Sequence, residues 1–459
     1  MTVRIALIAA LAALLPLSAM GEEGASKGDG VPDPSIATSL PPRLADPGGH
    51  RAALAKRGVT YGLNYIGEVI GVPSGGVKRG SQYDGRLEAY TDVDLEKLVG
   101  LRGLTFHASA FQIHGTSVTA RNVGSIAPVS FIEATPATRL FEVWLEQSLF
   151  DGKVSVRAGQ LAADSEFLTS EGGGAFINGT FGWPTIAASS LPDGGPAYPL
   201  AAPGVRVKVK PTDRLTLMAA VFNGQVARPS GCDDPQRCNR HGTDFPLGDP
   251  VLLMVEGTYK FNISLPGTVK LGGWHHDGNF DHVRTDDTGM ALASGGSSGV
   301  ARVLSGNHGL YGVVDQLLYR APGTEDKGTG LFARVVGTPD DRNLIDLYLE
   351  GGLTFSGLIR GRPDDVFGIG VAYSRISSGT RGFDKDRNAD AGIGAATRDY
   401  EALLEISYTA QIVPGWTLQP DFQYFWHPGG GGVDPDDDAT APARARDVAV
   451  LGLRTTIKY

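Results

Sequence analysis

The stretch at residues 86–96, RLEAYTDVDLE, places a charged or aromatic side chain at every second position. Arg86, Glu88 and Tyr90 begin this series, and apolar residues such as Leu87 and Ala89 stand between them. Successive side chains of a β-strand point to opposite faces, so the pattern predicts a strand with one wet face and one apolar face. Such a strand fits a soluble sheet, and it also fits a barrel with lipid outside and water inside.

Similar alternation recurs along the chain and favours the barrel. In GVRVKVK at 204–210 the charges share one parity and the valines share the other. A Lys or Arg that faces lipid at the bilayer midplane costs roughly 2–4 kcal/mol, so charges are expected on the parity that faces the lumen. RLFEVWLEQSLF at 139–150 likewise sets Glu142 and Glu146 against Phe141. About sixteen strands are predicted, at 59–71, 83–96, 102–115, 137–150, 153–161, 202–210, 214–225, 249–261, 267–280, 307–320, 328–338, 343–356, 365–376, 398–412, 415–427 and 446–459.

The connections between these strands tend to alternate in length, which is typical of an outer-membrane barrel with short turns at one end and long loops at the other. The short ones include Asp151-Gly152 and Val413-Pro414, and the link near 338–342 is an exception because it should be long. The closing TTIKY is expected to pair with the first strand, so that no edge stays exposed. We therefore predict an all-β fold, a transmembrane antiparallel barrel. The long connections are 116–136, 162–201, 226–248, 281–306, 377–397 and 428–445.

The N-terminus indicates export. MTVR followed by IALIAALAALLPL predicts a secretory signal peptide over residues 1–21. Residues 22–57 are expected to form a flexible leader with a short helix, and 58–459 the barrel. No later segment reaches the roughly 20 apolar residues that a spanning helix needs. The net charge of −9, without a cluster of Lys and Arg, argues against a nucleic-acid partner, and we expect none.

Several long motifs carry a resemblance to a known family. They are DVDLEKLVGLRGLTFHASAFQIHG at 92–115, LFEVWLEQSLFDGKVSVRAGQLAADSEF at 140–167, LPDGGPAYPLAAPGVRVKVKP at 191–211, EISYTAQIVPGWTLQPDFQYFWHPGG at 405–430 and VLGLRTTIKY at 450–459. From about residue 50 onward the chain resembles the OprB family of carbohydrate-selective outer-membrane porins. The resemblance implies a sixteen-stranded barrel through which small neutral carbohydrates diffuse across the outer membrane of a Gram-negative bacterium.

Selection in such a channel depends on pore width and on the polar groups at its narrowest part. The connection 162–201 is too long for a simple turn, so we expect this third outer loop to fold into the lumen and form the constriction. The alternative is a purely structural role, in which the inward charges solvate the wall or pair with one another and the tryptophan of this loop packs the loop against the wall. The candidate channel residues are Arg86, Glu88, Glu142, Trp144, Glu146, Arg157, Asp164, Glu166, Glu171, Asn178, Trp183, Arg206 and Lys208.

Other signals are weaker. Cys232 and Cys238 are expected to form a disulfide in an exported loop, with two free thiols as the alternative. DKDRNAD at 384–390 spaces its oxygens like calcium ligands but lacks the glycine and closing glutamate of an EF-hand, so a solvated polar loop is expected. GGSSG at 295–299 lies in a loop and does not indicate a hydrolase. We expect no enzyme, no cofactor and no metal site.

Two functional alternatives remain open at this stage. One is a general or ion-preferring porin without sugar selectivity, because the predicted lumen carries charges of both signs. The other is an outer-membrane barrel that acts through its loops as an adhesin. Outer-membrane lipid and lipopolysaccharide are expected partners in each case, and a homo-oligomer is compatible with the sequence.

Overall fold

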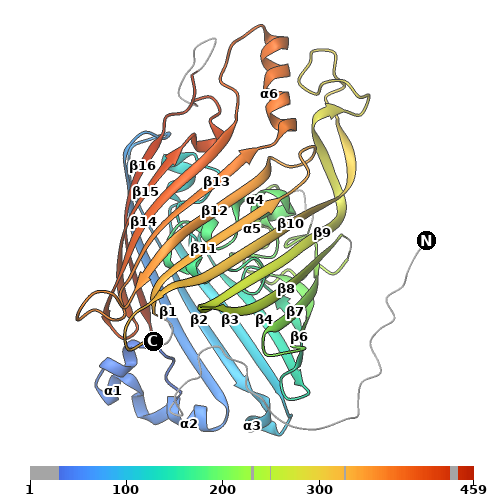
Figure 1. The fold of residues 1–459 in the computed structure, drawn as a ribbon. Helices are drawn as coiled ribbons and strands as arrows, with labels where there is room; N and C mark the ends of the chain where they lie inside the picture. Colours follow the sequence, from blue (N-terminus) through green and yellow to red (C-terminus); the bar gives the residue numbers. More distant parts are fainter. Residues whose placement is uncertain (1–29, 229–231, 249, 325–326, 435–442) are drawn as a thin grey trace.

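The computed structural model describes residues 30–228, 232–248, 250–324, 327–434 and 443–459, so the predicted signal peptide at 1–21 lies outside it. The described chain forms one closed barrel in which each strand pairs antiparallel with its sequence neighbours (Figure 1). This confirms the predicted fold class and the sixteen strands. The strands are β1 (Val59–Ser74), β2 (Gly80–Asp94), β3 (Leu104–Gly115), β4 (Ala137–Leu149), β5 (Val154–Leu161), β6 (Ala202–Val209), β7 (Leu215–Asn223), β8 (Val251–Ile263), β9 (Leu265–Asp286), β10 (Ala301–Arg320), β11 (Gly328–Gly337), β12 (Ile345–Ser356), β13 (Val366–Ile376), β14 (Tyr400–Val413), β15 (Trp416–Trp426) and β16 (Val448–Lys458).

The first and last strands close the barrel. Asn64 of β1 pairs with Lys458 of β16. Beyond them Leu63 and Tyr459 exchange two backbone hydrogen bonds, of 2.8 and 2.7 Å. A lipid-facing strand must satisfy its backbone groups within the protein, and this pairing does so at the seam between the two ends of the chain.

Several predicted strand boundaries differ from the structure, and those of β2, β9 and β10 have a clear physical reason. The strand expected to run to residue 96 ends at Asp94, whose carboxylate accepts hydrogen bonds from the amides of Glu96 and Lys97, both at 3.1 Å, and so starts a short helix. In addition, β9 and β10 extend into the expected loop 281–306 and leave only 287–300 as a connection. Beyond the membrane both faces of a strand meet water, so the alternation that marks a strand is lost there.

Helix α6 (Ser378–Ala391) occupies the segment for which we expected a solvated polar loop, so that expectation is wrong. Ser377 caps its N-terminus by accepting from the amide of Thr380 at 3.2 Å. The polar residues are supported by ion pairs to other segments, because Asp384 contacts Arg398 at 2.7 Å and Asp386 contacts Arg284 at 2.7 Å. Burial alone would raise the pKa of Asp384, but its hydrogen bonds with Arg398 outweigh burial and lower it.

The remaining helices are short. None of the helices in the described residues is long and apolar enough to cross a membrane. They are η1 (Ile36–Ser39), α1 (Pro42–Ala45), η2 (Pro47–Gly49), α2 (His50–Lys56), α3 (Leu95–Val99), η3 (Thr119–Val123), η4 (Gly172–Ala175), η5 (Gly179–Phe181), α4 (Thr185–Ser190), η6 (Pro192–Gly194), α5 (Pro235–Cys238) and η7 (Pro428–Gly430).

Residues 30–57, where the sequence suggests a flexible leader with one helix, form several short helices at the end of the barrel that carries the short turns (Figure 1). Arg51 of α2 is buried, and its guanidinium lies 4.4 Å from the ring centre of Tyr61 and 4.7 Å from that of Tyr459. It also donates to the carbonyl oxygens of Gly30 and Tyr61, at 3.2 and 3.0 Å. These contacts hold the segment against the seam between β1 and β16.

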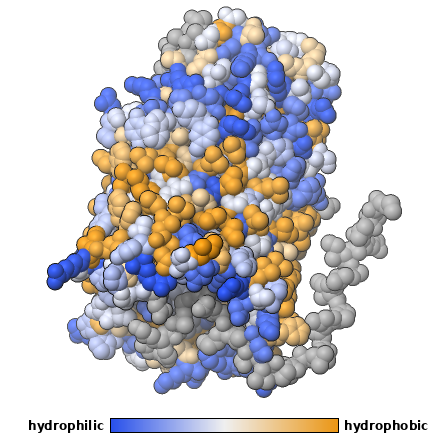
Figure 2. All heavy atoms as spheres, in the orientation of Figure 1, coloured by the Kyte–Doolittle hydropathy of each residue, from blue (hydrophilic) through white to orange (hydrophobic). Residues whose placement is uncertain are grey.

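The outer face carries the apolar parity of the strands. On the face seen in Figure 2, a band of hydrophobic side chains crosses the barrel between more hydrophilic ends. Leu87, Val255 and Leu453 are among the exposed apolar residues of the strands. Phe141 departs from the predicted pattern because an irregularity in the β3–β4 pairing shifts the register beside it. It is buried, and its ring centre lies 4.7 Å from that of Phe111.

The inner face is only partly polar. Buried apolar side chains of the wall, including Ile70, Phe332 and Phe425, belong to one hydrophobic cluster with Phe167 and Ile186 of the long connection 162–201. That connection therefore packs against the wall as a protein core does, and part of the barrel is filled with protein.

Candidate functional site

The third connection, residues 162–201, is suspended from the inner wall by its backbone. Carboxylates from three separate strands accept hydrogen bonds from its amide groups. Hydrogen bonds to a charged group contribute about 1.5–3 kcal/mol each, so these carboxylates position the connection strongly. The bonds are Leu168 N to Glu256 of β8 (3.1 Å), Gly172 N to Asp315 of β10 (3.1 Å), Ile177 N to Glu405 of β14 (2.5 Å) and Asn178 N to Glu405 (3.0 Å).

The burial pattern of the strands places these contacts on the inner face. On β11, Leu331 and Val335 are exposed on the apolar outer side, whereas Phe332 and Arg334 between them are buried. The third connection approaches this inner side closely, because a Cβ atom on Gly172 would lie 2.6 Å from the ring of Phe332. Glycine is thus required where the backbone meets the wall.

Arg334 is the strongest single attachment of the third connection. Its side chain is fully buried and pairs with Glu350 of β12 at 2.8 Å. The same guanidinium donates to four backbone carbonyls of the connection. Five N–H donors in a fixed plane suit this role, which a lysine could not reproduce. The acceptors are the carbonyl oxygens of Leu168, Thr180 (3.1 Å), Phe181 (3.0 Å) and Gly182 (3.1 Å).

Five of the predicted channel residues pair with one another through their side chains and not with the backbone of the connection. We call this group the ion-pair cluster: Glu146, Arg157, Glu166, Arg206 and Lys208. The register aligns β4, β5 and β6 so that Glu146 lies opposite Arg157, and Arg157 opposite Arg206. Glu166 of the third connection completes the cluster. Its ion pairs are Glu146–Arg157 (2.7 Å), Glu146–Arg206 (3.1 Å), Glu166–Arg206 (2.7 Å), Glu166–Lys208 (3.0 Å) and Glu166–Arg157 (3.6 Å).

The ion-pair cluster is partly open to solvent. Arg206 is fully buried, but the side chain of Lys208 is 29% exposed and those of Glu146 and Arg157 are 18% and 16% exposed. Three cations and two carboxylates give the cluster a net charge of +1. The cluster therefore presents both hydrogen-bond donors and acceptors to the lumen.

Trp144 lies beside the ion-pair cluster with both ring faces occupied. The guanidinium of Arg157 is 3.8 Å from its ring centre, and the imidazole of His107 stacks on it at 4.9 Å with an interplanar angle of 15°. His107 in turn contacts Asp92 at 2.7 Å. Cation–π contact and stacking fix the orientation of Arg157 toward its carboxylate partners.

Arg86 and Glu88 of β2 also face inward, at a distance of 3.7 Å from each other. The guanidinium of Arg86 lies 4.7 Å from the ring centre of Phe111 and 5.2 Å from that of Tyr198 in the third connection. Glu88 accepts a hydrogen bond from Asn64 at 3.2 Å. This pair therefore lines the wall next to the connection.

Two of the predicted acidic residues fasten the beginning of the third connection. Glu142 accepts from the amide of Ala162 at 2.9 Å, and Asp164 accepts from the amide of Tyr198 at 2.8 Å. Burial raises the pKa of Asp164 to about 6, although the hydrogen bond that its carboxylate accepts from the backbone amide of Tyr198 opposes that rise. Both residues act here through the backbone they hold.

Three predicted channel residues of the third connection lie away from the ion-pair cluster. Asn178 is buried and donates to Gln423 of β15 at 2.9 Å. Trp183 donates from its indole nitrogen to the carbonyl of Gly194 at 3.0 Å, within the connection itself. Glu171 is exposed at the start of η4.

Sequence reasoning missed the wall residues that hold the long connections. Glu401 of β14 accepts from the amides of Ile126 (2.7 Å) and Ala127 (2.8 Å) in the connection 116–136. The available indication was a lone charge inside an otherwise apolar strand, as for Glu256 in VLLMVEG. Such a charge needs a buried partner, and here backbone amides supply it.

Cys232 and Cys238 are joined by a disulfide, with their Cα atoms 5.9 Å apart. Within the residues that the structure covers, no group of three or more His, Cys, Asp or Glu side chains is arranged to hold a metal ion.

Comparison with known proteins gives a consistent result. A family model described as carbohydrate-selective porin, OprB family, matches residues 78–459. Porin B of Pseudomonas aeruginosa is 25% identical over 421 residues, which are 86% of this chain and 88% of that protein. A putative porin, QuiX, of Acinetobacter baylyi is 22% identical over 432 residues, with coverage of 86% and 90%.

A solved structure shares the fold. The high-pH structure of Pseudomonas putida OprB superposes with a TM-score of 0.79 at 23% sequence identity, and the match covers 90% of this chain and 97% of that one.

Proposed function

Because the chain belongs to the OprB family of carbohydrate-selective porins, we propose that small neutral sugars diffuse through its barrel across the outer membrane, past a constriction that the third connection and the ion-pair cluster form together. Sugar passage of this kind is passive and needs no catalytic group. The band of apolar side chains meets outer-membrane lipid and lipopolysaccharide.

The ion-pair cluster is the observation that carries this proposal. Its charges satisfy one another, so its net charge of +1 is small for five ionised side chains. A sugar offers hydroxyl groups that both donate and accept, and the partly exposed Lys208 and Glu146 supply the complementary partners. Many weak hydrogen bonds allow a solute to enter and also to leave, which conduction requires.

The attachment of the third connection supports a constriction of fixed width. Arg334, Glu256 and Glu405 hold its backbone at separate strands. A connection held at this many points keeps a fixed position inside the barrel, so solute size as well as hydrogen bonding determines passage.

A liposome-swelling assay on the refolded protein tests the proposal. The solutes are D-glucose, a disaccharide, and an amino acid of a size close to that of glucose. We expect glucose to enter faster than the amino acid, and Arg157→Ala to reduce this ratio because the substitution removes one of the two cationic partners of Glu146 and the cation–π contact with Trp144. Arg375→Ala is the matched control, because Arg375 pairs with Asp346 and is 44% exposed at the long-loop end.

Two outcomes would contradict the proposal. Equal rates for glucose and the amino acid would indicate a general porin that selects by size alone. An absence of swelling with protein shown to be folded would favour an adhesin that acts through its loops.

A further inference from the structure

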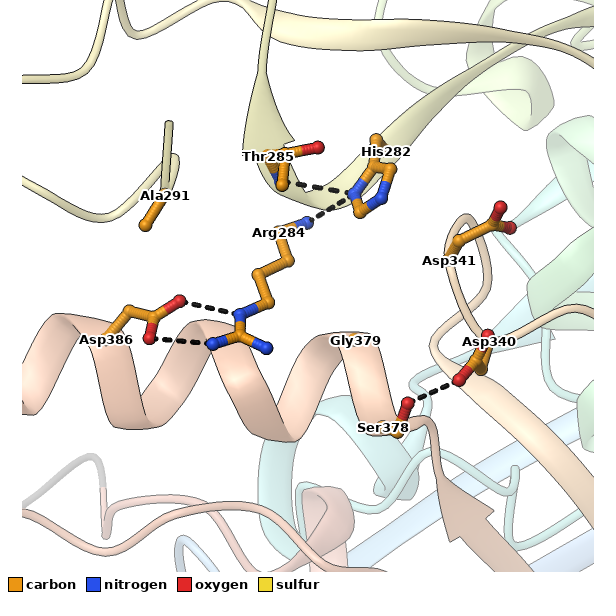
Figure 3. A pocket seen from close by; sticks show the side chains of 9 residues that line it. All are labelled: His282, Arg284, Thr285, Ala291, Asp340, Asp341, Ser378, Gly379 and Asp386. Carbon is orange, nitrogen blue, oxygen red and sulfur yellow. Dashed lines mark hydrogen bonds and ion pairs between the residues drawn. The ribbon is translucent and has the colours of Figure 1, made fainter. Parts of the chain in front are cut away.

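A cavity of about 460 Å³ opens at the long-loop end of the barrel, away from the ion-pair cluster (Figure 3). Its walls are formed by the extended end of β9, the connection 287–300 that follows it, the connection 338–344 between β11 and β12, and helix α6. Its volume lies within the range of small-molecule sites, which is about 300–1,000 Å³.

Hydrogen bonds join three of these walls, β9, the connection 338–344 and α6. Arg284 of β9 donates from Nε and Nη2 to the two carboxylate oxygens of Asp386 in α6, at 2.7 and 3.0 Å. Ser378 at the start of α6 donates to Asp340 of the connection 338–344. Figure 3 shows both links at the edges of the cavity, with the space between them open. The cavity is therefore a built feature of the outer end, with walls that hold their spacing.

The protonation of His282 is defined by its neighbours. Its Nδ1 accepts hydrogen bonds from the backbone amides of Arg284 and Thr285, at 3.0 and 3.1 Å. An imidazole nitrogen that accepts carries no proton, so His282 is neutral and Nε2 bears its hydrogen. His282 thus supplies one N–H donor to the cavity.

The carboxylates of the cavity have unequal partners. Asp386 is paired with Arg284, and Asp341 binds the guanidinium of Arg342 at 2.8 and 3.1 Å. Asp340 is exposed, and its carboxylate accepts a hydrogen bond from the uncharged hydroxyl of Ser378. Its carboxylate keeps accepting capacity toward the cavity, because each carboxylate has about four acceptor positions.

A donor from His282 and an acceptor from Asp340, held in one cavity, match adjacent hydroxyl groups of a polyol, each of which both accepts and donates. An anionic ligand is disfavoured because three carboxylates line the space and its arginine is already paired with Asp386. We propose that this cavity is an outer binding site for a neutral saccharide, which holds the sugar at the mouth of the barrel before it enters the lumen. The inference rests on the proposed function, because it concerns the same class of solute.

Saturation-transfer NMR with D-glucose on the purified, folded protein in detergent tests the inference. Asp340→Asn removes the charged acceptor, and Ala291→Trp fills the cavity without removing any of its hydrogen-bonding side chains. We expect each to weaken glucose binding at least about fivefold, Asp340→Asn because it weakens one to two hydrogen bonds to the sugar and Ala291→Trp because its ring occupies the space of the sugar. Asp281→Asn is the matched control, because Asp281 is an exposed neighbour of His282 outside the cavity, and it should leave binding within about twofold.

The outcomes separate this inference from the proposed function. Arg157→Ala alters the constriction, so binding that survives in Arg157→Ala and is lost in Asp340→Asn supports the outer site. Unchanged binding in both Asp340→Asn and Ala291→Trp, with swelling still selective for glucose, would overturn the outer site alone. Equal swelling rates of the wild-type protein with glucose and with the amino acid would instead overturn the proposed function.

Discussion

The inner wall of this barrel uses the same charged residue types in two different ways on its two sides. On β4–β6, acidic and basic side chains pair with one another and with Glu166 of the third connection in the ion-pair cluster, and these side chains remain 13–29% exposed, apart from Arg206. On β8 to β14 a second group of charged side chains is buried, and most of their hydrogen-bond partners are backbone groups of the long connections. We call this second group the anchoring residues: Glu256, Asp315, Arg334, Glu350, Glu401 and Glu405.

The difference shows that the partner of a charge, and not its presence on the lumen face, determines its role. A part-exposed ion pair contributes little to stability, because water already solvates both groups. A buried charge without its partner costs several kcal/mol, so each anchoring residue and the groups that it contacts stabilise each other. Permeation is therefore expected to depend on the ion-pair cluster, and the shape of the channel on the anchoring residues.

Arg334→Ala should have the largest effect on this contrast. The substitution leaves Glu350 buried without its cation and removes the donor to four carbonyls of the third connection. We expect the free energy of unfolding to fall by about 3–5 kcal/mol. Single-channel conductance should rise, because the third connection loses its strongest attachment. Chemical unfolding in lipid vesicles and planar-bilayer recording measure the two effects.

Arg375→Ala serves again as the control for Arg334→Ala. It removes a guanidinium from an exposed ion pair with Asp346 and should change the unfolding free energy by less than about 1 kcal/mol. Similar losses for the two variants would mean that the buried attachment has no special role.

The sequence was sufficient for the wall and insufficient for what fills it. A period of two is local, so RLEAYTDVDLE and GVRVKVK predict strands and their inner faces without knowledge of the partners. The alternation was lost where both faces meet water, which explains why the ends of β9 and β10 were missed. The π-type and 3₁₀ turns of the long connections have no comparable period.

The site was predicted in part for the same reason. Arg157, Arg206 and Lys208 alternate with apolar residues, and the register of neighbouring strands brings them to one place. The local sequence does not predict that Glu405 accepts hydrogen bonds from the amides of residues 177 and 178. These partners are separated along the chain by 228 and 227 positions. Such pairings depend on the tertiary structure alone.

Asp164 lies between the two classes, because it is a carboxylate near the ion-pair cluster that holds a backbone amide. Burial raises its pKa from the usual 3.8 to about 6 in the folded protein. The folded state therefore binds this proton more tightly than the unfolded chain does. Its contribution to stability is fully present below about pH 4 and is lost as the pH rises through about 6.

Asp164→Asn cannot titrate, so it isolates this contribution. One pKa unit corresponds to about 1.4 kcal/mol, so the wild type should lose up to about 3 kcal/mol relative to the variant between pH 4 and pH 7. Parallel unfolding free energies for the two proteins across this range would show that Asp164 is solvated like an ordinary surface carboxylate.

Lys208→Ala should have the smallest effect on stability and a clear effect on permeation. Lys208 is 29% exposed and pairs only with Glu166 among the ion pairs of the cluster, so the unfolding free energy should fall by less than about 1 kcal/mol. The net charge of the ion-pair cluster changes from +1 to zero, so the reversal potential in a potassium chloride gradient should shift toward cation preference. Lys153→Ala makes the same charge change at the short β4–β5 turn, and it should leave the reversal potential unchanged. An equal shift in both variants would mean that total charge, and not the ion-pair cluster, determines which ions pass.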